Sequence, residues 1–259
     1  MSLYKLHPSS VGKIMTDAKS IDKSLLTTEE FTRIGFDRDV EEIKALIKKK
    51  SKTDADQEIL NFLWDRTLPE GGKTYLKKIV GEISLGYRKE LDVKAFSKGK
   101  MCEDAAIELV NQVYFKSYEK HIGRVETDLL TGECDIYVPK VVVRDIKNAW
   151  SLDTFPAFKE DAHTSEYEYQ LRSYMHLYDV PTSFLDWCML DTPEELIKWE
   201  QPSLHYVSHI DPCLRVTTVE YRRDMDIERK LLIRCAEAQV YIERMKKQFL
   251  IDHNYEYES

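Results

Sequence analysis

Residues 132–150, "GECDIYVPKVVVRDIKNAW", decide the fold, because they combine the apolar residues of a buried hairpin with charges that such a hairpin normally excludes. Residues 133–138 and 141–147 are short and rich in β-branched side chains, as strands are. Asp135, Asp145 and Lys147 interrupt them. An unpaired buried charge costs several kcal/mol. We therefore expect these three side chains to face solvent, to pair with one another, or to hold a metal ion.

The length of the connection between the two strands decides whether the two aspartates share a face. Side chains alternate faces along a strand, so Asp145 and Lys147 point the same way. A two-residue turn at 139–140 would set Asp135 on the opposite face, whereas a three-residue connection at 139–141, or a bulge, brings both aspartates to one face. Two-residue turns favour Gly or Asn, and this one would be Pro-Lys. We therefore expect the longer connection.

Two carboxylates on one face resist joint ionisation unless a cation lies between them. Carboxylate oxygens are the ligands that Mg²⁺ and Mn²⁺ prefer, and such a cation lowers the pKa of water and polarises a phosphate. A lysine two residues beyond the second carboxylate can orient the attacking water and offset the charge that develops on phosphorus. The three residues therefore predict a site that cleaves phosphodiester bonds.

The order of these residues resembles the PD-(D/E)xK nuclease superfamily. The segment "GECD" ends at Asp135, and "DIK" begins ten positions later at Asp145. This arrangement is similar to the core motif of the superfamily. Glu103, in "KGKMCEDAAIEL" (98–109), is similar to the acidic residue on a preceding helix in the RecB-like and phage lambda-exonuclease-like branch. Glu108 on the same segment is the alternative. Asp145 is a departure, because the exonuclease branch more often has glutamate there.

Two further segments carry the resemblance. "YEYQLRSYMHLYDV" (167–180) supplies Gln170 and Tyr174 as the Q-x-x-x-Y pair of this branch. Ser9, in "HPSSVGKIM" (7–15), is similar to an amino-terminal serine that contacts phosphate in the phage enzymes, although an N-cap for the first helix explains it without further assumption. No residue matches the basic residue that precedes this serine in the lambda-type enzymes.

The resemblance implies a metal-dependent DNA exonuclease that processes duplex ends in phage-type recombination. Mg²⁺ or Mn²⁺ would be held by Glu103, Asp135, Asp145 and the carbonyl of Ile146, with Lys147 positioning the water, and Gln170, Tyr174 and Ser9 would contact DNA. The resemblance further implies that the protein works beside a single-strand annealing protein and forms a ring-shaped homo-oligomer. It also implies that a phage encodes the protein and that it acts in the bacterial cytoplasm. The alternatives are an endonuclease of the same superfamily, or a nucleic-acid-binding or assembly protein without turnover.

The rest of the 259-residue chain predicts an α/β fold with a mixed central sheet flanked by helices, as in restriction endonucleases. We expect one nuclease domain over 1–259, made of a helical N-terminal region (1–97), a catalytic core (98–222) and a C-terminal helix (223–250). Within it, periodicity and capping signals predict helices and strands. The helices are 37–50, 54–65, 73–85, 98–115, 165–178 capped by Ser165, and one opening at Thr192; the strands beyond the hairpin are 182–190 and 214–221.

Composition excludes several other classes. The five cysteines form no C-x-x-C pair, the seven histidines show no metal-ligand spacing, and no apolar run is long enough to span a membrane. The net charge is −8, whereas a protein that binds nucleic acid by bulk electrostatics is usually basic. DNA binding would therefore depend on bridging metal ions or on a local basic patch, for which the lysines at 48–52, 77–78, 94, 98 and 100 are candidates.

Overall fold

The computed structural model describes residues 3–87 and 94–255, which form two compact units. The helical unit consists of Met1–Tyr4, Lys13–Gly86 and Arg229–Ser259. The sheet unit consists of Lys5–Gly12 and Tyr87–Glu228. The first helix, α1 (Pro8–Met15), and the last, α11 (Met225–Asp252), each contribute residues to both units. A single nuclease domain over 1–259 stays a prediction.

The helical unit holds α2 (Thr28–Arg33), α3 (Val40–Lys48), α4 (Asp54–Arg66) and α5 (Glu70–Leu85), together with most of α11. Local signals explain where these helices begin: Asp39 caps α3, and Thr53 forms a capping box with Asp56 at the start of α4. The apolar faces of α2, α3 and α4 share one core, built on Ile21, Phe31, Ile43, Leu60 and Leu63.

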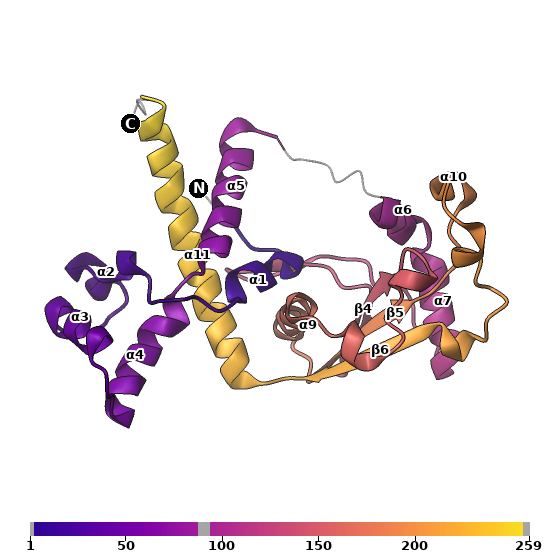
Figure 1. The fold of residues 1–259 in the computed structure, drawn as a ribbon, viewed down its shortest axis with the longest axis horizontal. Coiled ribbons are helices and arrows are strands. Elements are labelled where there is room, and N and C mark those ends of the chain that lie inside the picture. The colour runs from indigo at the N-terminus through magenta and orange to yellow at the C-terminus, as the bar shows by residue number, and fades with distance from the viewer. Residues whose placement is uncertain (1–2, 88–93, 256–259) are drawn as a thin grey trace. The chain divides into compact units, whose positions relative to one another are not determined.

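A four-stranded mixed sheet forms the centre of the sheet unit (Figure 1). Its strands are β3 (Ile136–Val138), β4 (Val142–Asn148), β5 (Thr182–Cys188) and β6 (Val216–Arg222), in that spatial order. The central pair, β4 and β5, is parallel, and each outer strand is antiparallel to its neighbour. A separate two-stranded ladder joins β1 (Val125–Glu126) to β2 (Thr131–Gly132). The predicted mixed α/β fold with flanking helices and a long C-terminal helix is confirmed.

Helices cover both faces of this sheet, with α7 (Glu103–Tyr114) on one side and α9 (Ser165–Tyr178) on the other (Figure 1). The apolar face of α7 packs against Ile136, Ile146 and Cys188. The opposite face of β4 carries Asp145 toward α9, because neighbours along a strand alternate sides. The same alternation therefore places Asp145 and Lys147 on the face of β4 opposite to the one that packs against α7. Shorter helices, α6 (Lys94–Met101), α8 (Lys159–Ala162) and α10 (Glu194–Ile197), complete the unit.

The predicted continuous helix over 98–115 is wrong. The chain leaves the α-helical conformation at Cys102, where φ is −103° and ψ is 7°, and α6 and α7 are separate helices on either side of it. No proline marks the break, so periodicity alone carries straight across it. The consequence for function is that Glu103 becomes the first residue of α7, where a carboxylate is favoured by the helix dipole.

Three predicted caps are also wrong. The cap of α9 is Thr164 rather than Ser165, because the Thr164 hydroxyl accepts the Tyr167 N–H at 3.2 Å. Thr192 does not cap α10; its hydroxyl instead donates to the Trp150 carbonyl at 3.1 Å. Ser9 lies within the first turn of α1, which begins at Pro8, because proline suits the opening position of a helix.

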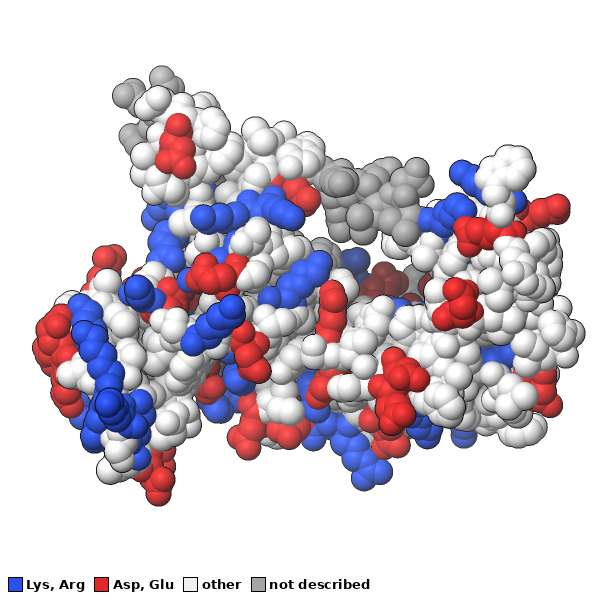
Figure 2. Space-filling model, in the orientation of Figure 1, with Lys and Arg blue, Asp and Glu red and all other residues white. Residues whose placement is uncertain are grey.

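Two of the lysines considered for a local basic patch, Lys94 and Lys98, are engaged within the sheet unit. Lys98 is fully buried and donates to the Trp150 carbonyl at 3.0 Å, while Lys94 pairs with Glu200 at 2.7 Å. On the face shown in Figure 2, acidic and basic side chains are interspersed within each unit. No helix in the described part of the chain combines the length and the apolar character that crossing a membrane requires.

Candidate active site

The hairpin between β3 and β4 has the three-residue connection expected from the sequence. Val138 pairs with Val142, and Ile136 pairs with Arg144, so the same register sets Asp135 opposite Asp145. Lys140 takes the left-handed conformation in the middle of the connection, with φ at 62°, and the chain closes by a hydrogen bond from the Val141 N–H to the Val138 carbonyl at 3.0 Å. The connection therefore brings the two carboxylates to one place.

Asp135 lies just before the first residue of β3. Its side chain, rather than a main-chain carbonyl of β3, bonds to the main chain of β4 at this level. Its carboxylate accepts a hydrogen bond from the main-chain N–H of Ile146. Burial, followed by repulsion from Asp145, raises the pKa of Asp135 to about 7, although the bond from Ile146 and the Lys147 ammonium oppose the shift. Without a cation, therefore, Asp135 keeps its proton to a much higher pH than an ordinary aspartate does.

Asp145 is buried in the centre of β4 and is held from two sides. Its Oδ1 accepts a hydrogen bond from the amide of Gln170 on α9 at 2.9 Å. Its Oδ2 lies 2.6 Å from the Lys147 ammonium, yet receives no hydrogen bond of regular geometry. A buried carboxylate oxygen in this condition can accept a cation without giving up an existing hydrogen bond.

Lys147 shares a face with Asp145, as strand parity predicts, and its side chain is 26 % exposed. Burial lowers the pKa of Lys147, but the Asp145 carboxylate outweighs it and the net shift is upward. Its ammonium also lies 5.4 Å from the centre of the Tyr167 ring, at the start of α9. Tyr167, two turns before Tyr174 on α9, was not predicted from the sequence as a residue of this site.

Glu103 lies close enough to Asp135 to contribute to the upward shift of the Asp135 pKa, whereas Glu108 is exposed further along α7. The carboxylate of Glu103 pairs with Lys120 at 2.9 Å. Among residues 3–87 and 94–255, no three acidic, histidine or cysteine side chains already surround one point as metal ligands would. The structure thus brings Asp135, Asp145 and Lys147 together directly and places Glu103 beside them.

The Q-x-x-x-Y pair lies at the same site. Gln170 contacts Asp145, and Tyr174 one turn further donates its hydroxyl to the main-chain carbonyl of Glu133 at 2.8 Å. Gly132 allows this approach, since a Cβ there would lie 2.7 Å from Pro8 and 3.2 Å from the Tyr174 ring. The first turn of α1, with Ser9 exposed on it, therefore lies beside the aromatic face of α9.

A second buried ion pair lies on the other face of β4. Arg144 makes two hydrogen bonds to Asp186 of β5, at 2.7 and 2.8 Å, and Asp186 also accepts from Thr218 of β6. The guanidinium lies among three aromatic rings. Because this face is closed by α7, the pair holds strands together and takes no part in the site. Sequence reasoning missed it, since its members are distant in the chain and match no motif.

The donor set fits a hard divalent cation. Two carboxylates converge, one of them disfavours ionisation without a counter-charge, and one buried carboxylate oxygen lacks a regular hydrogen bond. Mg²⁺ and Mn²⁺ take such oxygen ligands together with water. Asp135 and Asp145 would hold the cation, and Glu103 is the nearest additional carboxylate.

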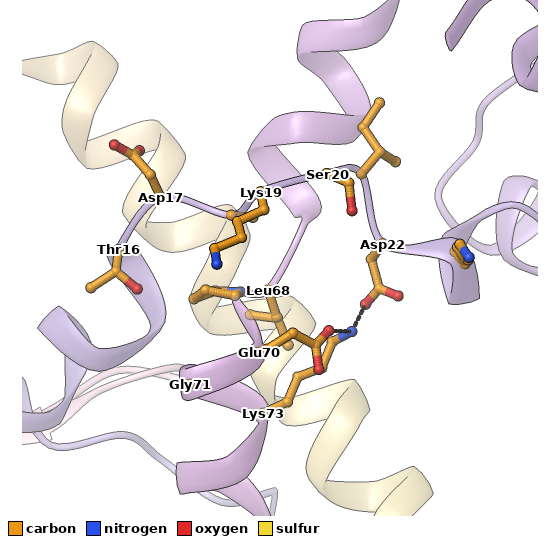
Figure 3. A pocket seen from close by; sticks show the side chains of 13 residues that line it. Thr16, Asp17, Lys19, Ser20, Asp22, Leu68, Glu70, Gly71 and Lys73 are labelled. Carbon is orange, nitrogen blue, oxygen red and sulfur yellow. Dashed lines mark hydrogen bonds and ion pairs between the residues drawn. The ribbon is translucent and has the colours of Figure 1, made fainter. Parts of the chain in front are cut away.

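A cavity of about 570 Å³ lies in the helical unit and contains none of these residues. Figure 3 shows Lys73 between Asp22 and Glu70, bonded to both, at 2.7 and 3.0 Å. The other charged residues that line the cavity are of both signs: Asp17, Lys19 and Lys23. The lining is thus largely neutralised from within, unlike the carboxylate pair of the sheet unit.

Comparison with solved structures shows which class of protein has this fold: phage-type and alkaline exonucleases. A phage-related exonuclease from Haemophilus somnus 129PT matches with a TM-score of 0.74 and 24 % identity, over 95 % of this chain and 97 % of that one. The alkaline exonuclease LHK-Exo from Laribacter hongkongensis matches with a TM-score of 0.55 and 13 % identity, over 96 % and 95 %. LHK-Exo in complex with dAMP gives 0.58 and 12 %, over 98 % and 95 %.

No protein-family model and no curated protein sequence matches this chain. The resemblance drawn from the sequence is therefore confirmed at the level of the fold, over nearly the full length.

Proposed function

We propose that this protein is a metal-dependent deoxyribonuclease that degrades DNA from an end. The observation that carries the proposal is the convergence of Asp135 and Asp145 beside the Lys147 ammonium, with Gln170 holding one oxygen of Asp145. The nearly full-length likeness to exonuclease structures supports the same activity, and one of them was solved with the deoxynucleotide dAMP.

The residues divide the work as follows. Asp135, Asp145 and Glu103, with the main-chain carbonyl of Ile146, would hold Mg²⁺ or Mn²⁺, which supplies Lewis-acid chemistry to the phosphate and lowers the pKa of water. Lys147, fixed by Asp145, orients the attacking water and offsets the growing negative charge on the phosphate. Gln170 keeps the Asp145 carboxylate in one rotamer.

The proposal also covers the residues that contact DNA. Gln170 and Tyr174 line the α9 side of the carboxylates, and Ser9 on α1 lies near Gly132 and Tyr174. We propose that these residues hold the scissile strand. A recombination role beside a single-strand annealing protein, a ring-shaped oligomer, and action in a bacterial cytoplasm from a phage-encoded chain remain expectations of the same proposal.

The test compares linear duplex DNA with covalently closed circles of the same sequence, in Mg²⁺, in Mn²⁺ and in EDTA. We expect the linear DNA to be degraded only with the cation and the circles to stay intact; nicked or linearised circles would favour the endonuclease instead. Asp145→Asn and Lys147→Ala should each lower the rate at least ~10³-fold without loss of folding, as removal of charge stabilisation does. Asp179→Asn, an exposed carboxylate, serves as the matched control.

A wild-type protein that binds DNA but releases no nucleotides with either cation would support the binding or assembly alternative. Unchanged rates in both site variants would end the nuclease proposal.

A further inference from the structure

The segment that joins α7 to β1, residues 115–124, is fastened beside the carboxylates at two points. The Asn111 side chain exchanges two hydrogen bonds with the main chain of Tyr118, at 2.7 and 2.9 Å. Three residues later, the His121 N–H donates to the main-chain carbonyl of Asp135 at 2.8 Å. Lys120 lies between these anchors, so its main chain is held next to Asp135.

The Lys120 ammonium reaches the acidic cluster from its solvent side. It lies 2.9 Å from the Glu103 carboxylate and 4.0 Å from Asp104, and its side chain is 42 % exposed. The Lys120 ammonium therefore lies against Glu103, one proposed cation ligand, while the neighbouring residue His121 is bonded to the main chain of Asp135, another.

The two lysines around Asp135 differ in what they are free to do. Lys147 is tied to the buried Asp145 and lies against Tyr167. Lys120 has a half-exposed partner, and exposed ion pairs are weak enough to exchange readily. Glu103 cannot serve a divalent cation and an ammonium equally well. Whenever a cation engages Glu103, a fixed positive charge beside the site becomes available to an anion.

We propose that Lys120 is a second phosphate-binding lysine of this site. It holds Glu103 while no cation is present, and it binds a backbone phosphate of the DNA substrate when Glu103 is engaged elsewhere. The inference rests on the proposed function and deepens it, because it assigns a residue to the capture of the nucleic-acid backbone. Charge-assisted contacts from lysine to phosphate oxygen are the chemistry concerned.

Lys116 provides the matched control. It lies on the same segment and is exposed, but its side chain makes no contact with the carboxylates. Lys120→Met and Lys116→Met remove the same charge from neighbouring positions, and Lys120→Arg keeps the charge at the site. Any effect specific to Lys120→Met therefore reports its contact with Glu103 and the phosphate, rather than net charge.

Two measurements that need no turnover test the assignment. In titration calorimetry without DNA, Lys120→Met should bind Mn²⁺ about 3- to 10-fold more tightly than Lys116→Met, because Glu103 has lost its competing cation. With a labelled duplex in Ca²⁺, Lys120→Met should bind about 3- to 10-fold more weakly than Lys116→Met, and the slope of log affinity against log salt should fall by about one. Lys120→Arg should restore DNA affinity.

Equal Mn²⁺ and DNA affinities for Lys120→Met and Lys116→Met would overturn the assignment. So would a wild-type protein that binds neither Mn²⁺ nor DNA, which would remove the proposed function as well. A wild type that binds both but never cleaves would sink only the proposed function, since the two affinities still decide whether Lys120 contacts phosphate.

Discussion

Asp135 and Asp145 do different work although they are chemically identical and lie opposite each other. The Asp145 carboxylate is held by Lys147 and Gln170, whereas the Asp135 carboxylate has only a main-chain N–H and lies against a second carboxylate. Burial and repulsion from Asp145 raise the pKa of Asp135 to about 7. The two aspartates therefore differ in their bonding partners, and Asp135 is the one whose proton affinity is raised.

This asymmetry predicts how stability depends on pH in the metal-free protein. The pKa of Asp135 is higher in the folded state than in the unfolded state, so between about pH 4 and pH 7 the folded state binds more protons. The contribution of Asp135 to the free energy of unfolding therefore decreases as the pH rises through this range. Asp135→Asn cannot titrate, so its free energy of unfolding relative to wild type should increase over that range. Urea unfolding at several pH values in EDTA measures the difference.

Asp161→Asn, at an exposed carboxylate on α8, should show no such trend and serves as control. A difference between Asp135→Asn and wild type that stays constant from pH 4 to 7 would contradict the raised pKa.

At this scale the sequence predicted the residues that belong to a recognisable spacing and missed the others. Asp135, Asp145 and Lys147 follow from strand parity and loop length, and both held. Lys120 and the Arg144–Asp186 pair were not predictable, because each depends on segments that only the tertiary fold brings together. A lone lysine in a turn is ordinarily a solvated one.

Among the elements, the β3–β4 hairpin has the greatest influence on the site. Its middle residue, Lys140, has φ at 62°, a conformation that costs most residues about 1 kcal/mol relative to glycine. Its ammonium pairs with Asp179 at 2.8 Å, but both side chains are exposed and the pair contributes little. The backbone, rather than the ion pair, therefore limits the stability of this connection.

We expect Lys140→Gly to be about 1 kcal/mol more stable than Lys140→Ala, because both lack the ammonium and only glycine is relieved of the strain. Chemical denaturation of the two variants measures this directly. Equal stability, or a less stable glycine variant, would show that the left-handed conformation at this position is not the limiting feature.

Element boundaries were harder to predict than element types. The strands of the central sheet and helix α9 occur where the sequence patterns placed them, but the break at Cys102 and the cap at Thr164 were not predicted, and neither was α8. Both depend on a choice between adjacent residues of similar propensity. Tertiary contacts make that choice: an apolar face of α7 packed on β4, and a helix start that turns Tyr167 toward Lys147.

On the scale of the whole molecule, the helical unit is built from both ends of the chain. Arg234 of α11 is buried and donates to the main-chain carbonyls of Ile14 and Thr16, at 3.1 and 3.0 Å. Those carbonyls have left α1 without helical partners, so a side chain from the C-terminal helix satisfies them. Most of the sheet unit, Tyr87–Glu228, is encoded between these two parts.

Arg234→Met should lower the free energy of unfolding by about 2–4 kcal/mol, because it leaves the buried carbonyl of Ile14 and the partly buried carbonyl of Thr16 without this donor while keeping most of the volume. Hydrogen exchange should quicken mainly in Lys13–Gly86 and Arg229–Ser259. Lys247→Met, at an exposed position of the same helix, should change neither quantity. Faster exchange confined to the sheet unit would contradict this account.

The general architecture was predictable at this scale, and the partition of the chain was not. Alternating strands and helices after residue 98 predicted the mixed sheet, which the comparison with exonuclease structures confirms. No local sequence pattern indicates that residues 229–259 belong to the same unit as the N-terminal helices, because this grouping depends on long-range contacts such as those of Arg234.

The connection at 139–141 also constrains how this gene can evolve. Loss of the codon for Val141 would leave Pro139 and Lys140 to close the hairpin, and proline cannot take the positive φ that so tight a turn needs at its first position. The register of β3 against β4 would shift by one residue, and Asp135 and Asp145 would then face opposite sides of the sheet although neither had been substituted. Homologous chains should therefore keep three residues between Val138 and Val142, with a residue at position 140 that tolerates positive φ, whereas a deletion there would separate Asp135 from Asp145.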